Sequence, residues 1–354
     1  MHPRQKTGHA QRHPNWHRDV KQDIMKKNIA IVAGGDQSEV VVSLKSAQGL
    51  YSFMDKEMYD LYIVTIIGQE WQAEHNNQKY PIDKNDFSFM LNGNKIKFDC
   101  AYVTIHGVPG EDGKLQGYFE LIGMPYTCCN VLAASVTFNK YACNHYLKDF
   151  GVPVADSILV RRGQKIDEDA IVERIGLPCF IKPNAGGSSF GVTKVKSKDQ
   201  ISLAIGKALG EGDQVLIEGL MTGTEITCGI YKTAQRTVVL PITEVVSHNE
   251  FFDYDAKYKG QVDEITPARL SSDVTKRVQQ QTELIYDALG AHGLIRVDYI
   301  ILENGTISLL EVNTNPGMTA TSFIPQQVRA AGLDIKDVMT EIIEDSIAAK
   351  HKQN

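Results

Sequence analysis

The sequence SLLEVNTNPGMTATSF at residues 308–323 combines an apolar strand with a turn and a loop of small polar residues. Apolar residues dominate positions 307–312, which predicts a strand. Glu311 and Asn313 are two positions apart, so their side chains point to the same face of that strand. Carboxylate and amide oxygens are ligands that suit Mg²⁺ or Mn²⁺ better than Zn²⁺. The strand is therefore expected to end at a site for a hard divalent cation.

A second strand is predicted at residues 294–302, LIRVDYIIL, just before the first. Arg296 and Asp298 interrupt its apolar residues and share one face. The two adjacent strands thus offer three metal ligands with Arg296 beside them: Asp298, Glu311 and Asn313. These groups could instead be solvent-facing positions of a β-hairpin that turns at residues 303–305. Their convergence on one face, ahead of an anion-binding loop, favours a functional site.

The loop that follows has the features of an anion site. Pro316 and Gly317 end the strand, and small residues continue as far as Ser322. Pro325 is expected to be the first residue of a helix, because proline loses no hydrogen bond at that position. Loop amides ahead of a helix N-terminus bind anions.

The composition is that of a soluble globular protein of two or three domains, with 354 residues and a net charge of −6. The negative charge argues against nucleic acid as the main partner. No apolar run reaches the roughly 18 residues that cross a membrane. Six cysteines without CxxC spacing are expected to be reduced thiols of a cytoplasmic protein. Residues 1–24 are polar and His-rich, and we expect a disordered extension before a natural start at Met25.

The N-terminal region has the pattern of an open α/β sheet, with a buried strand at residues 28–32, a Gly-Gly turn and a helix at 38–54. Ligands bind at the carboxyl ends of such strands. Glu39 lies in the first helical turn, where it could simply complement the helix dipole. A strand at 98–105 leads into HGVPGEDG, residues 106–113. This loop is either a binding element or a plain turn.

The central region contains a second loop that could bind phosphates. Residues 130–150 are predicted to form one helix, which carries Lys140. A strand at 179–182 then brings Lys182 to PNAGGSSFG, residues 183–191. This loop lacks the GK[ST] ending of a Walker A motif, but its amide groups can still fold over phosphates. A flexible hairpin without a ligand is the alternative.

Residues 247–261, SHNEFFDYDAKYKGQ, are polar and aromatic without a regular period. A loop of this length inside a compact domain is usually a lid or a binding element. We expect it to be mobile without ligands and ordered with them. Helices are predicted after it, at 271–289 and 337–349.

These motifs resemble those of the ATP-grasp ligases. EVNTNPGMT, HG-x-x-GEDG and the GG-x-x-x-E-x-x-x-S spacing from Gly34 to Ser43 resemble the D-alanine–D-alanine ligase family in particular. The resemblance extends over roughly residues 28–349, with the motifs in the family's order. It implies an α/β (α+β) fold in which an ATP-grasp unit follows an N-terminal open α/β, Rossmann-like domain. One departure is Val41, where many members carry a second acid.

The resemblance also implies a domain division and a role for each candidate residue. The domains are an N-terminal substrate domain at 25–127, a central ATP-grasp subdomain at 128–218 and a C-terminal subdomain with the metal and acceptor sites at 219–350. Two Mg²⁺ (or Mn²⁺) ions would be held by Asp298, Glu311 and Asn313. ATP would be contacted by Lys140, Lys182, Ser188, Glu218, Glu225 and Lys257. The catalytic set would be Glu39, Ser188, Tyr258, Arg296, Gly317 and Ser322. D-Alanine would be bound by Glu39, His106, Ser322 and Phe323.

The implied reaction uses ATP to activate one D-alanine as an acyl phosphate and joins it to a second, which supplies peptidoglycan precursor synthesis. The expected partners are D-alanine and ATP, with no nucleic acid and no membrane, and the protein is expected to be a cytoplasmic homodimer. A D-alanine–D-lactate ligase and another ATP-grasp carboxylate–amine ligase remain as alternatives. In the family, tyrosine at the position of Tyr258 accompanies dipeptide ligases and phenylalanine accompanies those that accept D-lactate. A non-catalytic nucleotide-binding module would be expected to have lost metal ligands, which this chain retains.

Overall fold

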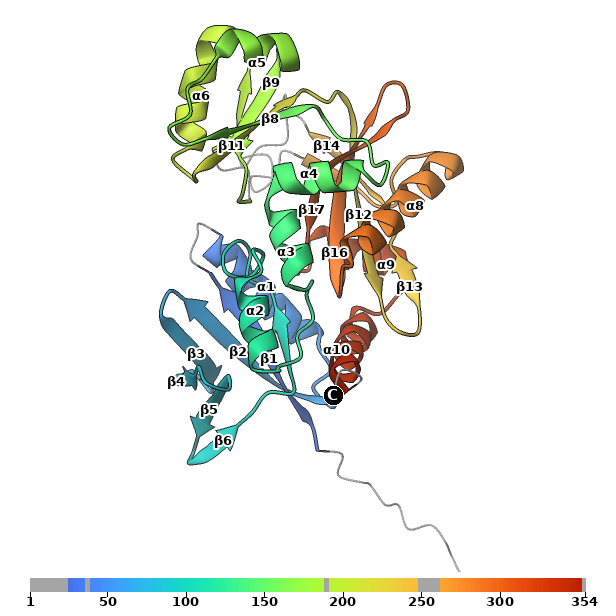
Figure 1. The fold of residues 1–354 in the computed structure, drawn as a ribbon. Helices are drawn as coiled ribbons and strands as arrows, with labels where there is room; N and C mark the ends of the chain where they lie inside the picture. Colours follow the sequence, from blue (N-terminus) through green and yellow to red (C-terminus); the bar gives the residue numbers. More distant parts are fainter. Residues whose placement is uncertain (1–24, 36–38, 188–190, 248–261, 352–354) are drawn as a thin grey trace, which may run out of the picture.

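The computed structural model describes residues 25–35, 39–187, 191–247 and 262–351. Their strands form three sheets, of seven, four and six strands. Figure 1 shows helices α3 (Val131–Phe138) and α4 (Lys140–Lys148) where the three sheets meet. Within the described residues, no helix is long and apolar enough to cross a membrane.

The first sheet is built around parallel strands near the N-terminus, as expected for an open α/β sheet. β1 (Lys27–Gly34) pairs in parallel with both β2 (Tyr59–Ile67) and β7 (Cys100–Val103). Helix α1 (Val40–Phe53) follows β1 and packs against it. Glu39 is the N-cap residue of α1, so it lies at the carboxyl end of β1.

Four antiparallel strands extend this sheet beyond β2, and they were not predicted from the sequence. They are β3 (Glu70–His75), β4 (Gln78–Asp83), β5 (Ser88–Leu91) and β6 (Asn94–Ile96). Asn92 and Gly93 connect β5 to β6 at positive φ, as in the two-residue type I′ hairpins that favour Asn-Gly. Helix α2 (Lys114–Leu121), which follows the HGVPGEDG loop, was also not predicted.

The second sheet carries the Gly/Ser loop and has its own apolar core. Its strands are β8 (Ser157–Arg161), β9 (Cys179–Pro183), β10 (Thr193–Val195) and β11 (Gln214–Gly219). Helices α5 (Glu168–Ile175) and α6 (Ile201–Ala208) pack on it and close that core. A 3₁₀ turn at Lys198–Gln200 precedes α6.

The single helix predicted at residues 130–150 is wrong, because the chain breaks into α3 and α4 at Asn139. The Asn139 side chain accepts a hydrogen bond from the Ala142 N–H at 2.9 Å and so caps a new helix. The Lys140 N–H donates a hydrogen bond to the Asn184 carbonyl, outside the helix, at 2.9 Å. The break places Lys140 at the start of α4, facing the Gly/Ser loop.

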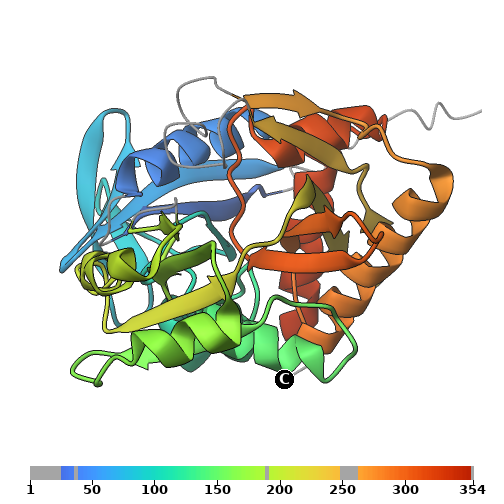
Figure 2. The same cartoon turned by 90° about the horizontal axis from the view of Figure 1, so that it is seen from above.

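The third sheet contains the two strands with the polar face. Its strands are β12 (Gly223–Lys232), β13 (Thr237–Val239), β14 (Thr243–Ser247), β15 (Val262–Ile265), β16 (Leu294–Leu302) and β17 (Ile307–Asn313). Helix α8 (Ser272–Leu289) packs on this sheet as predicted, with Ser271 as its N-cap. Figure 2 shows the third sheet (gold to red) beside both the first (blue to teal) and the second (green to yellow).

The helix after the anion loop begins earlier than expected. Helix α9 (Phe323–Ala330) starts at Phe323, so Pro325 is its third residue and not its first. Ser322, in an extended conformation, is the N-cap. Proline is tolerated there because the N–H groups of the first helical turn have no partner within the helix.

The last helix, α10 (Ile335–His351), packs against the first sheet, far from it in sequence. It contacts α1 and β7. Met339 and Ile343 share one buried core with Ile31 of β1 and Leu50 of α1. The first and third sheets are thereby joined through a common core, which fixes the loop after β17 against the N-terminal region.

Candidate active site

The two strands predicted to bind metal pair with each other and bring their polar residues together. Asp298 on β16 is the Cα partner of Glu311 on β17, and Arg296 is the partner of Asn313. A register shift follows between Asp298 and Tyr299. The predicted convergence of these four side chains is confirmed, while their roles remain predictions.

Asp298 is the centre of this group. Arg296 donates to both of its carboxylate oxygens, at 2.8 Å each. Thr227 donates its hydroxyl at 2.6 Å, and Asn313 donates through Nδ2 at 3.0 Å. Burial by itself lowers the pKa of Arg296, but the charge and hydrogen bonds of Asp298, together with the charges of Glu311 and Glu111, outweigh burial and the pKa is raised. Arg296 is therefore a fixed positive charge at the edge of the site.

The oxygen ligands on β16 and β17 fit a hard divalent cation that takes its remaining ligands from a bound molecule and from water. Asp298 and Glu311 offer carboxylates, and Asn313 offers an amide oxygen. Within the described part of the chain, no group of three or more His, Cys, Asp or Glu side chains could hold a metal ion. Mg²⁺ needs six ligands and usually takes one or two carboxylates, completing its shell with phosphates and water. The residues therefore suit a cation that comes with nucleotide phosphates.

Lys140 connects this group to the Gly/Ser loop. Its Nζ lies 3.5 Å from Glu311 Oε2 and donates to the Gly186 carbonyl at 2.8 Å. Gly187 lies so close to Glu39 that a Cβ added there would be 2.8 Å from Glu39 Oε2. The loop thus lies between Lys140 and the start of α1, and Gly187 approaches the end of the Glu39 side chain closely.

The remaining described nucleotide candidates come from two neighbouring sheets. Lys182 on β9 and Glu218 on β11 are both buried and form an ion pair. Glu225 lies on β12, opposite Val245 and Ile300. Because β12 follows β11 after a short connection, the three residues lie on either side of the junction between the second and third sheets.

Three predicted site residues lie outside the residues that the structure describes, and so does most of the predicted lid at 247–261. They are Ser188, Lys257 and Tyr258.

The HGVPGEDG loop is bonded to the loop after β17. Asn315 donates through Nδ2 to the carbonyls of Ile105 and Gly110, at 3.1 and 2.8 Å. Its backbone N–H donates to Glu111 Oε1 at 3.4 Å. Glu111 Oε2 in turn accepts from the Gly107 N–H at 2.8 Å. These bonds make the two loops a single unit.

Two ionisable groups of this unit have unusual pKa values. Burial raises the pKa of Glu111 to about 7, and the charge of Glu39 adds to the rise. Burial lowers the pKa of His106 to about 4, and the charge of Arg296 adds to the fall. The His106 ring is therefore neutral near pH 7.

Glu111 and Asn315 were not predicted as site residues, although both lie in motifs that were singled out. Glu111 follows a glycine and Asn315 precedes a proline, so each lies in a turn where a polar side chain can bond to the backbone. Their partners are about two hundred positions away in the sequence, so the sequence alone gave no sign of what they hold.

The predicted anion loop brings its candidates to Arg296. The Arg296 guanidinium lies over the Phe323 ring, 5.3 Å from its centroid. Ser322 Oγ accepts from the Thr319 N–H at 3.1 Å. A Cβ added at Gly317 would be 3.1 Å from the same oxygen. Gly317, Ser322 and Phe323 therefore lie together at one end of β16 and β17.

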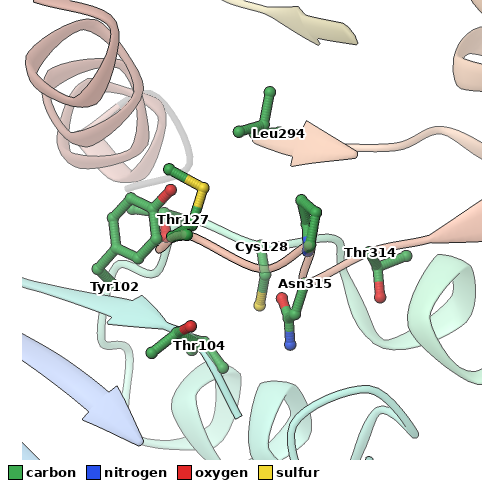
Figure 3. Close-up of a pocket in the computed structure, with 10 residues that line it drawn as sticks. Tyr102, Thr104, Thr127, Cys128, Leu294, Thr314 and Asn315 are labelled. Atoms are coloured by element: carbon green, nitrogen blue, oxygen red, sulfur yellow. The ribbon is translucent and has the colours of Figure 1, made fainter. Parts of the chain in front are cut away.

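A small cavity lies where this loop crosses from the third sheet to the first. Figure 3 shows Tyr102 and Thr104 on one side and Thr314 and Asn315 on the other, with Cys128 between them. The Thr104 hydroxyl is buried and has no hydrogen-bond partner among the described residues.

Comparisons with known proteins agree with this geometry. A family model for the D-ala D-ala ligase N-terminus matches residues 28–129, and one for the D-ala D-ala ligase C-terminus matches residues 146–344. A D-alanine–D-alanine ligase of Bacteroides fragilis is 66% identical over 322 residues, which cover 91% of this chain and 99% of that protein.

Solved structures are similar over nearly the whole chain. A D-alanine–D-alanine ligase from Bacillus anthracis complexed with ATP has a TM-score of 0.74 and 27% identity, covering 93% of this chain and 100% of that one. The VanG D-Ala:D-Ser ligase from Enterococcus faecalis has a TM-score of 0.79 and 30% identity, covering 91% and 99%. The fold class predicted from the sequence is confirmed.

Proposed function

Because the chain belongs to the D-alanine–D-alanine ligase family, we propose that it joins two D-alanine molecules at the expense of ATP. The carboxylate of the first takes the γ-phosphoryl group, giving D-alanyl phosphate and ADP. The amine of the second attacks the acyl carbon, and phosphate leaves as the peptide bond forms. The product, D-alanyl-D-alanine, is a precursor of peptidoglycan. The observation that best supports this function is the convergence of Asp298, Glu311, Asn313 and Arg296 beside two loops suited to anions.

The phosphoryl transfer depends on neutralising charge more than on covalent help from the protein. We propose that Lys140, Lys182 and Lys257 contact the phosphates. Mg²⁺, or Mn²⁺, supplies charge neutralisation when it is bound by Asp298, Glu311 and Asn313. Ser188 lies in the Gly/Ser loop that would cover the phosphates.

Glu218 and Glu225 would hold the adenine and ribose of ATP. Both lie beside the short connection between the second and third sheets. A flat ligand bound there could contact both sheets. The ion pair between Lys182 and Glu218 would fix the lysine in place until ATP binds.

The first D-alanine would be held through its ammonium group by Glu39. The carboxylate of Glu39 is buried beside the Gly/Ser loop, so it gains from a cationic partner. His106 would border the same site. Its ring is neutral near pH 7, and it therefore does not repel the ammonium.

The second D-alanine would be held through its carboxylate by Ser322 and the loop before α9, with Phe323 beside it. Arg296 and the amide of Gly317 would stabilise the oxyanion of the tetrahedral intermediate. Tyr258 would link through Ser188 to Glu39 and close the lid over the acceptor.

Three further points rest on the family resemblance. They are the identity of the metal as Mg²⁺ or Mn²⁺, a homodimeric state and a cytoplasmic location. The division into domains at 25–127, 128–218 and 219–350 likewise remains our proposal. The first and third sheets lie within these ranges, and the second sheet passes its boundary by one residue, since β11 ends at Gly219.

ATP-dependent phosphate release, compared side by side for D-alanine, L-alanine and D-lactate, tests the function. D-Alanine alone should sustain rapid release, because we propose that both sites bind a D-amino acid. L-Alanine should be inactive. D-Lactate mixed with D-alanine should add little beyond D-alanine alone. Equal rates with L-alanine and D-alanine would favour another ATP-grasp carboxylate–amine ligase.

A further inference from the structure

Ser46 connects two parts of the site that belong to different sheets. It lies on α1 and is completely buried. Its Oγ is 3.3 Å from His106 Nε2, in the HGVPGEDG loop. The same oxygen is 3.3 Å from the backbone nitrogen of Met318, in the loop after β17. One hydroxyl thus bridges the residue that borders the first D-alanine and the loop that receives the second.

The chemistry of the groups fixes the direction of one of these hydrogen bonds. The Met318 N–H can only donate, so Ser46 Oγ accepts from it. His106 is neutral near pH 7, so one of its ring nitrogens donates and the other accepts. The tautomer of the ring therefore sets whether Nε2 accepts from the Ser46 O–H or donates to Ser46 Oγ. In either case, a chain of bonds runs from His106 through Ser46 to Met318.

The loop after β17 is therefore fixed at two points. At Asn315 it is held by the Ile105 and Gly110 carbonyls. At Met318 it is held by Ser46 and by close backbone packing, since a Cβ added at Gly49 would be 2.1 Å from the Met318 carbonyl oxygen. Gly317, whose amide is proposed to bind the oxyanion, lies between the two points.

We propose that Ser46 is a positioning residue for the second half of the reaction, holding the 315–318 loop in the shape that binds the acceptor D-alanine. The inference rests on the proposed function of that loop. Ser46 is completely buried and is not among the residues proposed to contact either substrate. Its hydroxyl oxygen acts through the Met318 N–H, and the bond to His106 Nε2 holds that hydroxyl in place.

Ser43 provides a matched control. It lies one helical turn earlier on α1, is equally buried, and also bridges two backbone segments. Its Oγ accepts from the Gly34 N–H at 2.9 Å and donates to the Thr104 carbonyl at 2.8 Å. Ser43→Ala therefore removes the same chemical group, and a similar amount of stability, without touching the loop after β17.

The test compares Ser46→Ala, Ser43→Ala and wild type by initial rates over a wide range of D-alanine concentrations. Separate half-saturation concentrations are fitted for the first and the second D-alanine. Ser46→Ala should raise the half-saturation concentration for the second D-alanine by about two- to tenfold, the effect of losing one hydrogen bond. The half-saturation concentrations for the first D-alanine and for ATP should not change. Ser43→Ala should lower the melting temperature to a similar degree and leave the second half-saturation concentration unchanged.

Equal changes in the two variants, or an unchanged second half-saturation concentration in Ser46→Ala, would overturn the proposal. If Ser46→Ala does not fold, Ser46→Cys is judged by the same criterion, because sulfur fills the space but bonds weakly. Failure of the proposed function would look different, since wild type itself would then form no dipeptide.

Discussion

Asp298 and Glu311 lie directly opposite each other on β16 and β17. Asp298 is held by Arg296, Thr227 and Asn313, whereas Glu311 lies beside Lys140 at 3.5 Å. The two carboxylates thus have different surroundings, the first anchored within its sheet and the second turned toward the Gly/Ser loop. This arrangement leads us to expect that Glu311 is the more sensitive probe of the metal site.

Glu311→Gln keeps the shape of the side chain and removes one anionic ligand. Turnover should fall by about a hundredfold or more, because the charge of the bound cation is less well balanced. The far-ultraviolet circular dichroism spectrum should not change. Glu303→Gln, in the exposed turn at the other end of the same hairpin, is the control and should keep full activity. Glu311→Gln activity within a few-fold of wild type would show that this face does not bind the metal.

Glu111 should make stability depend on pH. Burial and the charge of Glu39 raise its pKa from 4.5 to about 7, against hydrogen bonds from Gly107 and Asn315 and the charge of Lys140. Between these values the folded protein retains a proton that the unfolded chain has lost, so the free energy of unfolding falls as pH rises.

Glu111→Gln cannot titrate, so its stability should decrease less than that of wild type between pH 5 and pH 8. The difference in free energy of unfolding between the two proteins should change by about 1–3 kcal/mol across this range. Urea unfolding at pH 5, 6.5 and 8 measures it. Parallel pH dependence of the two proteins would mean that Glu111 is ionised throughout.

Gly49 is required by the close approach of α1 to the loop after β17. A Cβ there would be 2.1 Å from the Met318 carbonyl oxygen, and overpacking of this kind costs about 1–3 kcal/mol. Gly49→Ala should therefore lower the melting temperature. Gly206→Ala in α6, where no atom lies within 4 Å of the added Cβ, should leave it unchanged or raise it slightly. Equal melting temperatures of the two variants would show that α1 and the loop after β17 are not closely packed at Gly49.

Tyr258 lies outside the described residues, and its role in acceptor choice stays a prediction from the sequence. Tyr258→Phe keeps the ring and removes one hydroxyl. Loss of one hydrogen bond typically changes a rate or a binding constant by about two- to tenfold. We expect weaker dipeptide synthesis and measurable D-alanyl-D-lactate. The measurement is the product ratio with both acceptors at equal concentration. A ratio equal to that of wild type would assign the discrimination to another contact.

The metal face could be predicted because a period of two assigns strand residues to a face without knowledge of the tertiary fold. Asp298, Glu311 and Asn313 needed only adjacent strands to converge. The strands β5 and β6 were missed although Asn92-Gly93 is a strong hairpin signal, because the flanking segments are short. The break at Asn139 was missed because helical pattern continues on both sides of it.

Ser46, Glu111 and Asn315 could not be predicted, for a different reason. Their partners lie in other sheets, at sequence separations between 204 and 272 for the contacts to the loop after β17. Nothing in local propensity or periodicity encodes such pairs. They follow only from the shared core of α1, β1 and α10, which brings the first and third sheets together.

Mass spectrometry of the product formed from D-alanine by the purified full-length protein tests the central claim most directly. With ATP and Mg²⁺ present, we predict D-alanyl-D-alanine in equal amount to the ADP released, and none when ATP or the divalent cation is left out. Absence of the dipeptide under the complete conditions, from protein shown to be folded, would contradict the account.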